Sequence, residues 1–141
     1  MNTCTFLVII SFFSLINIVA LSSGARELIL NKSRVLVSNG LRDDNITIHC
    51  YSSDDDLGTH QLTYGANFSW HFRTNLFDTT KFYCDFNTKY GSGKYGVFTW
   101  KLSVDYCGNF CIWIVVKVGP CLQADKKYVC QDWKNPPKTL S

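Results

Sequence analysis

Residues 49–60 bring together side-chain types that take part in much of protein chemistry, in the order HCYSSDDDLGTH. His49 and His60, with three aspartates between them, could supply the acid, the base and the carboxylate of a catalytic site. A calcium loop of the EF-hand type does not fit, because such a loop alternates its acids and ends in a bidentate glutamate, and no glutamate follows nearby. We interpret the stretch as a structured turn, in which serine and aspartate side chains bind backbone N–H groups and Gly58 permits a positive φ. Catalysis stays open as the alternative.

A second group with chemical potential is the segment 105–111, whose sequence is DYCGNFC. Cys107 and Cys111 have a spacing that zinc ligands can use, but no second close pair lies at a matching distance. The segment joins two predicted strands, and a loop pinned between cysteines loses little entropy when it binds a partner. We therefore predict a partner-binding loop, with a tight structural turn as the alternative. Its candidate contact residues are Asp105, Tyr106, Gly108, Asn109 and Phe110.

The N-terminal sequence indicates the compartment in which the protein acts. Residues 1–25 contain no charge, a long apolar run and the small residues Ser23, Gly24 and Ala25 at their end. This pattern predicts a signal peptide over residues 1–25, followed by one domain over residues 26–141. A signal anchor is the alternative, because the apolar run approaches the length that spans a bilayer. No later run is long enough to do so, and we therefore expect a secreted, extracellular protein that is not embedded in a membrane.

The cysteines suit that compartment. Cys4 leaves with the signal peptide, and an even number remains, which in a small secreted chain indicates a disulfide framework. The remaining cysteines are Cys50, Cys84, Cys107, Cys111, Cys121 and Cys130. Sequence alone does not choose among the possible pairings. Cys121 and Cys130 flank a predicted hairpin, and we expect them to pair with each other.

Glycosylation acceptors and charge bear on the class of partner. Acceptor sequons begin at Asn31, Asn45 and Asn67, which is consistent with a secretory route. The net charge is only +3, without any block of lysine or arginine, and this argues against a nucleic-acid partner. The sequence suggests no cofactor and no metal.

The rest of the chain reads as short strands that alternate apolar and polar residues. The predicted strands cover residues 34–38, 45–51, 67–73, 81–86, 95–104, 111–118 and 127–130. The strand 111–118 is apolar on both faces, as expected of a central strand that is packed on two sides. A turn is expected at Gly119 and Pro120. We predict an all-β fold, a small disulfide-bonded antiparallel β-sandwich of about seven strands.

The aromatic residues of these strands recur at every second position and indicate one shared interior rather than a ligand pocket. This predicted core set is Phe68, Trp70, Phe72, Phe82, Phe86, Phe98, Trp100 and Trp113. His71 and Arg73 occupy the opposite face of their strand. They are either a solvated surface or a contact for a partner, and a glycan on Asn67 would project from the same face.

Several motifs together resemble the plant self-incompatibility protein S1 family, also called S-protein homologues. The matching motifs are VSNGL at 37–41, HCYSSDDDLGTH at 49–60, Gly65, FSWHF at 68–72, NLFDTT at 75–80, FYCDF at 82–86, Cys107 and CIW at 111–113. The match covers residues 37–119, and the ordered set is specific although each motif alone is weak. The further cysteines Cys121 and Cys130 look more like those of the poppy stigma proteins, the best-known members of the family.

The resemblance implies a small secreted β-sandwich without catalytic activity or cofactor, and we expect it to be a monomer. In poppy-type systems such a protein is secreted by the stigma and binds an allele-matched membrane receptor on pollen. A match triggers calcium signalling and arrests the pollen tube. Two other functions are weighed against this one: a defence or developmental effector on the same scaffold, and a secreted ribonuclease. A ribonuclease needs two well-placed histidines and a lysine, and no such motif is visible.

Overall fold

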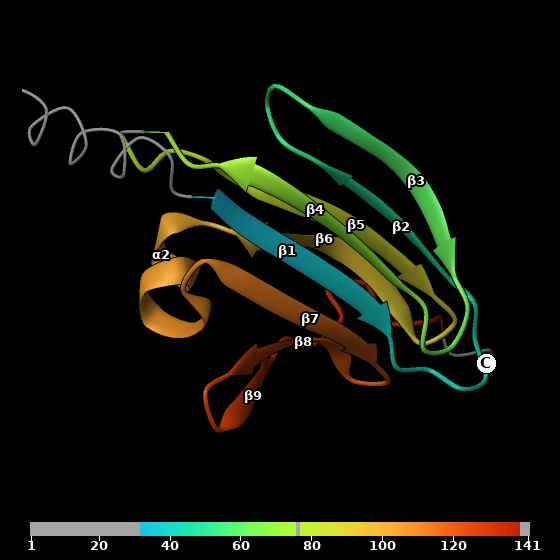
Figure 1. Cartoon of the computed structure of the whole chain (residues 1–141). Helices are drawn as coiled ribbons and strands as arrows, with labels where there is room; N and C mark the ends of the chain where they lie inside the picture. The colour runs from blue at the N-terminus through green and yellow to red at the C-terminus, as the bar shows by residue number, and fades with distance from the viewer. Residues whose placement is uncertain (1–31, 76, 139–141) are drawn as a thin grey trace, which may run out of the picture. The chain divides into compact units, whose positions relative to one another are not determined.

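The computed structural model describes residues 32–75 and 77–138, which form two β-sheets (Figure 1). The strands are β1 (Lys32–Asn39), β2 (Ile46–Tyr51), β3 (Asp56–Leu62), β4 (Asn67–Arg73), β5 (Phe82–Thr88), β6 (Gly91–Phe98), β7 (Phe110–Val116), β8 (Gly119–Ala124) and β9 (Lys127–Cys130). A short helix α2 (Trp100–Leu102) and a π-helical turn η1 (Ser103–Cys107) connect β6 to β7. The strand order is β4-β1-β7-β8-β9 in one sheet and β3-β2-β5-β6 in the other. The predicted all-β, disulfide-bonded class is confirmed.

The core lies between the two sheets and follows from the alternation of apolar residues along the strands. In β1 the buried side chains include Val35 and Val37, and in β2 they are Ile46, Ile48 and Cys50. Seven of the eight aromatic residues predicted for the interior are buried or pack against this core. The prediction was wrong for the eighth residue of the set, because Trp100 is 50% exposed.

The sheets differ from the prediction in strand number and in one pairing. Nine strands are present in the described part of the chain, rather than about seven. The pairing of β1 with β7 is parallel, with Val35 opposite Cys111 and Val37 opposite Trp113, whereas every other paired strand is antiparallel. As predicted, β7 is central in its sheet, but full burial is confined to one of its faces.

Three local assignments are corrected. The predicted strand over residues 95–104 ends at Phe98, because the Thr99 hydroxyl caps α2 by accepting a hydrogen bond from the backbone N–H of Leu102. The second half of the HCYSSDDDLGTH stretch is the strand β3, not a turn. Gly119 and Pro120 do not form the expected turn but are the first, buried residues of β8.

Three disulfides tie the fold together. Cys50–Cys84 joins the neighbouring strands β2 and β5, and Cys121–Cys130 joins β8 to β9, the pairing expected from the hairpin. Cys107–Cys111 links η1 to the start of β7. The zinc alternative at the last pair fails, because both sulfurs are in the disulfide. Within the described residues, no group of three or more His, Cys, Asp or Glu side chains is placed to hold a metal ion.

Other expectations concern the ends and surface of the chain. The signal peptide over residues 1–25 and the acceptor Asn31 lie outside the described residues. The acceptors Asn45 and Asn67 are both exposed. In the described ranges, no helix has the length and apolar character needed to cross a membrane.

Candidate functional site

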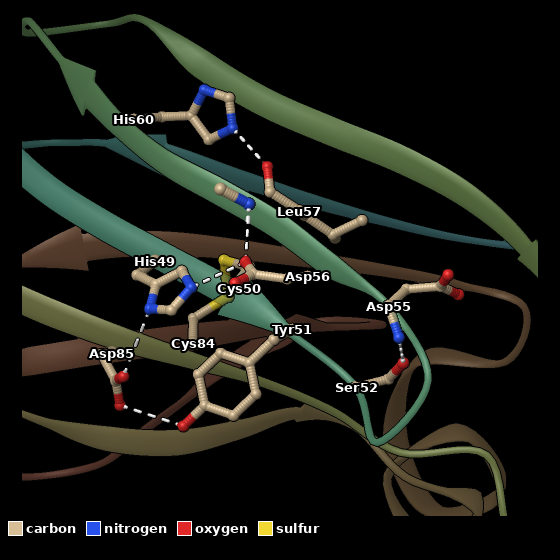
Figure 2. A network of polar contacts seen from close by, with 11 residues as sticks. His49, Cys50, Tyr51, Ser52, Asp55, Asp56, Leu57, His60, Cys84 and Asp85 are labelled. Atoms are coloured by element: carbon tan, nitrogen blue, oxygen red, sulfur yellow. Dashed lines mark hydrogen bonds and ion pairs between the residues drawn. A yellow bond between two sulfur atoms is a disulfide. The ribbon is translucent and has the colours of Figure 1, made fainter.

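His49 is the centre of a polar cluster on the outer face of the four-stranded sheet (Figure 2). The side chains at 49 and 51 project outward because Ile48 and Cys50, their neighbours on β2, point into the core. Nε2 of His49 lies 2.7 Å from Oδ1 of Asp56 on β3, and its Nδ1 lies 3.8 Å from Oδ2 of Asp85 on β5. The imidazole thus bridges three strands between two carboxylates.

Hydrogen bonds fix the two carboxylates. Asp56 accepts the backbone N–H of Gly58 at 2.9 Å, and this bond, with a smaller effect from His49, lowers the pKa of Asp56 below its ordinary value. Tyr51 donates its hydroxyl to Asp85 at 3.4 Å. Both ring nitrogens of His49 therefore face carboxylates. His49 therefore links β2 to both neighbouring strands, β3 and β5, through polar contacts.

His60 does not join this cluster. It pairs with Ile48 across β2 and β3, and so its ring points toward the interior, opposite to His49. The ring stacks on Phe68 of the other sheet at 3.9 Å between centroids, and its Nε2 is 2.8 Å from the carbonyl oxygen of Leu57. The catalytic interpretation needs both histidines at one site, and the sheet holds them on opposite faces.

Residues 52–55, between β2 and β3, form a structured turn, so the predicted turn is confirmed for this part of the stretch. The Ser52 hydroxyl accepts the backbone N–H groups of Asp54 and Asp55, and the Ser52 N–H donates to the carbonyl of Asp55 at 2.8 Å. Gly58 has a φ of 81°, as expected. The turn borders a hollow of about 480 Å³ whose opposite wall contains Arg73 and Lys81. The carboxylates of the turn are thus near cationic side chains at one end of the fold.

The segment 105–111 is held from three directions. Gly108 (φ 58°) donates its N–H to the carbonyl of Ser103 at 2.8 Å and accepts the Ser103 hydroxyl. The carbonyl of Asn109 accepts the backbone N–H of Arg34 on β1 at 2.8 Å. The Cys107–Cys111 disulfide ties the segment to the buried start of β7. The loop is therefore constrained before any partner arrives.

The five predicted contact residues of this loop are all exposed. Tyr106 and Phe110 are each 39% exposed, and the Arg34 guanidinium lies 4.8 Å from the centroid of the Phe110 ring. Asp105 and Tyr106 also line a hollow of about 440 Å³ with the β8–β9 turn, where Lys126 and Lys127 lie. The loop thus presents two aromatic rings beside charges of both signs.

Sequence reasoning missed two apolar side chains next to this loop. Trp100, which was predicted to point into the core, is 50% exposed, and Val104, on the same face of the predicted strand 95–104, is 61% exposed. Their spacing of four residues also fits a helix, and Thr99 is a good helix N-cap, so the signal was present but competed with an equally regular strand pattern. Together with Tyr106 they extend the apolar surface around η1.

Comparison with known proteins shows which sequences this chain resembles. The family model described as plant self-incompatibility protein S1 matches residues 34–133. S-protein homolog 3 of Arabidopsis thaliana is 34% identical over 107 residues, covering 70% of this chain and 71% of the relative. Self-incompatibility protein S1 of Papaver rhoeas is 32% identical over 122 residues, covering 84% of this chain and 81% of the relative. No solved structure gives a significant match.

Proposed function

The chain belongs to the plant self-incompatibility protein S1 family, and on that basis we propose that it is a secreted stigma ligand that triggers the rejection of self pollen. The ligand binds an allele-matched receptor in the pollen plasma membrane, and binding leads to calcium signalling and arrest of the pollen tube. Residues 1–25 are removed on secretion, and the extracellular protein acts as a glycosylated monomer without a cofactor.

The observation that carries this proposal is the constrained loop 105–111. A recognition ligand needs an exposed surface that keeps its shape, so that binding costs little conformational entropy. The disulfide and the bonds of Gly108 and Asn109 restrict the loop, while Tyr106 and Phe110 stay exposed. Aromatic side chains are common among the residues that contribute most to binding energy. The similarity to the Papaver rhoeas protein over 84% of this chain supports the same role.

A defence or developmental effector on the same scaffold is the second candidate. S-protein homologs 3 and 5 of Arabidopsis thaliana match this chain about as well as the poppy protein does, and their names assign no role in pollination. Such an effector could use the same loop with a different receptor. A ribonuclease is disfavoured by the placement of His49 and His60 on opposite faces of their sheet.

The experiment that separates these functions is a pollen assay. The mature protein, refolded with its three disulfides, is applied to germinating pollen of defined genotypes, and tube growth and cytosolic calcium are recorded. We expect arrest and a rise in calcium in one genotype class only. Equal growth in all genotypes contradicts the stigma role, and arrest of all genotypes together contradicts allele matching.

A further inference from the structure

The outer face of the five-stranded sheet carries an unusual row of apolar side chains on β7. The core-facing residues of this strand are Cys111, Trp113 and Val115. The residues between them point the other way, and all four are apolar: Phe110, Ile112, Ile114 and Val116. Leu36 of β1 lies opposite Ile112 and extends the row to the neighbouring strand. On a strand whose outer face is solvated, these positions normally carry polar residues.

The basic side chains of this face gather at one end of the row. Lys32 lies opposite Arg73, and Arg34 lies opposite His71, on the paired strands β1 and β4 (Figure 1). In the described part of the chain none of these four side chains has an ion-pair partner. The outward positions of β1, β4 and β7 include no aspartate or glutamate. Asp54 and Asp55, in the turn after Ser52, line one hollow with His71 and Arg73 but form no ion pair with them.

We propose that this face, defined by Arg34, His71, Arg73, Ile112 and Ile114, is a docking surface for an acidic, partly apolar segment of a partner protein. The inference rests on the proposed ligand function and names the chemistry of the partner. Carboxylates of the partner lie against the basic end, where Arg34 and Arg73 have no ion-pair partner among the described residues. Apolar side chains at every second position of an extended segment cover the β7 row, whose members recur at about 7 Å.

Two other occupants fit the face less well. A second copy of this chain brings the same face, which offers cations but no carboxylate to the basic end. An anionic membrane binds best to a surface on which cations surround a patch of protruding apolar side chains. Here the cations lie at one end, and Ile112 and Ile114 are half-buried in a sheet surface. An extended peptide can place its carboxylates at the basic end and its apolar side chains along the β7 row.

The test is a selection of displayed random dodecapeptides on the folded protein, followed by affinity measurements with synthetic copies of the enriched peptides. We expect enriched peptides with net negative charge and several apolar residues. Their binding should fall about tenfold or more in Arg73→Glu, and it should weaken as salt is raised. Ile112→Ser should reduce it by a similar factor, and Leu36→Ser is the second apolar variant if Ile112→Ser does not fold. Lys94→Glu is the matched charge control, because Lys94 is exposed on the other sheet and should leave binding unchanged.

Several results overturn the inference. Enriched peptides that lack acids, or that bind Arg73→Glu as well as wild type, contradict it. Binding of vesicles of phosphatidylserine with phosphatidylcholine that is lost in the same variants, without peptide binding, assigns the face to a membrane instead. Sedimentation that shows a dimer broken by Ile112→Ser assigns it to a second copy. If pollen responds but no acidic peptide binds, this inference alone fails; if acidic peptides bind but no pollen genotype responds, the stigma role fails and the surface stands.

Discussion

His49 and His60 stand on opposite faces of the four-stranded sheet, because His60 pairs with Ile48 across the β2–β3 ladder and shares its inward direction. Their roles therefore differ even though they flank one family motif. His49 joins exposed carboxylates of neighbouring strands, with its own side chain 37% exposed. His60 packs on Phe68 between the sheets and has a backbone partner.

This difference predicts unequal effects on stability. His60→Ala should lower the free energy of unfolding by about 1–2 kcal/mol, because it removes an aromatic stack and a hydrogen bond. His49→Ala should have a smaller effect, because exposed ion pairs contribute little. Urea denaturation of both variants measures this, with His71→Ala as the control for an exposed histidine. An equal loss in all three variants contradicts the assignment.

The wild-type protein should hydrolyse no RNA between about pH 5 and pH 8, the range in which histidine titrates.

The disulfides predict a second series of stability changes. In the chain-entropy model, stabilisation increases with the length of the closed loop. The sequence separation is 34 for Cys50–Cys84, 9 for Cys121–Cys130 and 4 for Cys107–Cys111. Replacing both cysteines of a pair by alanine should therefore cost about 4, 3 and 2 kcal/mol respectively. Thermal and urea unfolding give the values, and peptide mapping checks the pairs. A reversed order of losses shows that strain or packing outweighs loop closure.

The sequence predicted well the strands whose two faces differ. In β2 and β4 the residues that alternate in type also alternate in burial, and the apolar residues Ile46, Ile48 and Trp70 are the buried ones. β3 was missed because it is an edge strand with little burial, and because the acids before it and Gly58 within it resemble a turn. A strand can therefore be recognised from its sequence when one of its faces is buried and the other is not.

The features that depend on distant contacts could not be predicted. The parallel pairing of β1 with β7 brings distant residues together, so that the Ser38 hydroxyl donates to the carbonyl of Trp113, 75 positions away, and no local pattern indicates it. The same pairing exposes the apolar row of β7. Its apolar character on both faces was visible in the sequence and suggested packing on two sides, but the described strands cover only one side. The exposed loop was identified correctly as a linker, while its π-helical turn was not foreseen.

Two glycines provide a matched test of the backbone. A Cβ on Gly119 (φ 147°) would lie 1.8 Å from the carbonyl oxygen of Gln131, whereas a Cβ on Gly65 (φ 78°) would meet nothing within 4 Å. Gly65→Ala should cost about 1 kcal/mol, because the left-handed backbone alone is strained. Gly119→Ala should cost more than about 3 kcal/mol or prevent folding, because strain and a backbone clash add. Circular dichroism and urea unfolding measure both, and similar losses argue against the close approach of the tail to β8.

Asp43 predicts how stability changes in acid. The Lys89 ammonium lies 2.8 Å from Oδ2 of Asp43, and the Tyr90 hydroxyl donates to the same oxygen. Lys89, and then Tyr90, lower the pKa of Asp43 from 3.8 to about 2. A carboxyl whose folded pKa is lowered contributes stability above its unfolded pKa and loses that contribution as the pH falls toward the folded value. The contribution should therefore be complete above about pH 5 and should disappear between about pH 4 and pH 2.

The measurement is unfolding by urea as a function of pH. In Asp43→Asn the fall in stability between pH 4 and pH 2 should be shallower than in wild type, because this carboxyl no longer binds a proton on unfolding. Asp54→Asn, in the exposed turn after Ser52, controls for the loss of one negative charge. Carboxyl NMR shifts give the pKa of Asp43 directly. A value near 3.8 in the folded protein contradicts the interaction with Lys89 and Tyr90.

The final prediction concerns specificity and the loop 105–111. Binding energy usually concentrates in a few residues, among which aromatic side chains are prominent. Tyr106 and Phe110 are the expected anchors, because each is 39% exposed on a loop held by the Cys107–Cys111 disulfide. Asp105 should contribute charge complementarity. Truncating an anchor should cost on the order of 2 kcal/mol of receptor binding, about thirtyfold in affinity.

The fold should survive these changes, because none of the three side chains is buried. Tyr106→Ala, Phe110→Ala and Asp105→Ala are each checked by circular dichroism and then assayed for the arrest of self pollen. Tyr128→Ala is the matched control, because Tyr128 is 60% exposed on β9, outside the loop. Loss of arrest in Tyr106→Ala and Phe110→Ala, with Tyr128→Ala unchanged, places the specificity surface on the loop. If only Phe110→Ala loses activity, the contact follows the β7 row instead, because Phe110 is the one residue that the loop and that row share. Full activity in all three loop variants excludes the loop and leaves the face of His71 and Arg73 as the site of recognition.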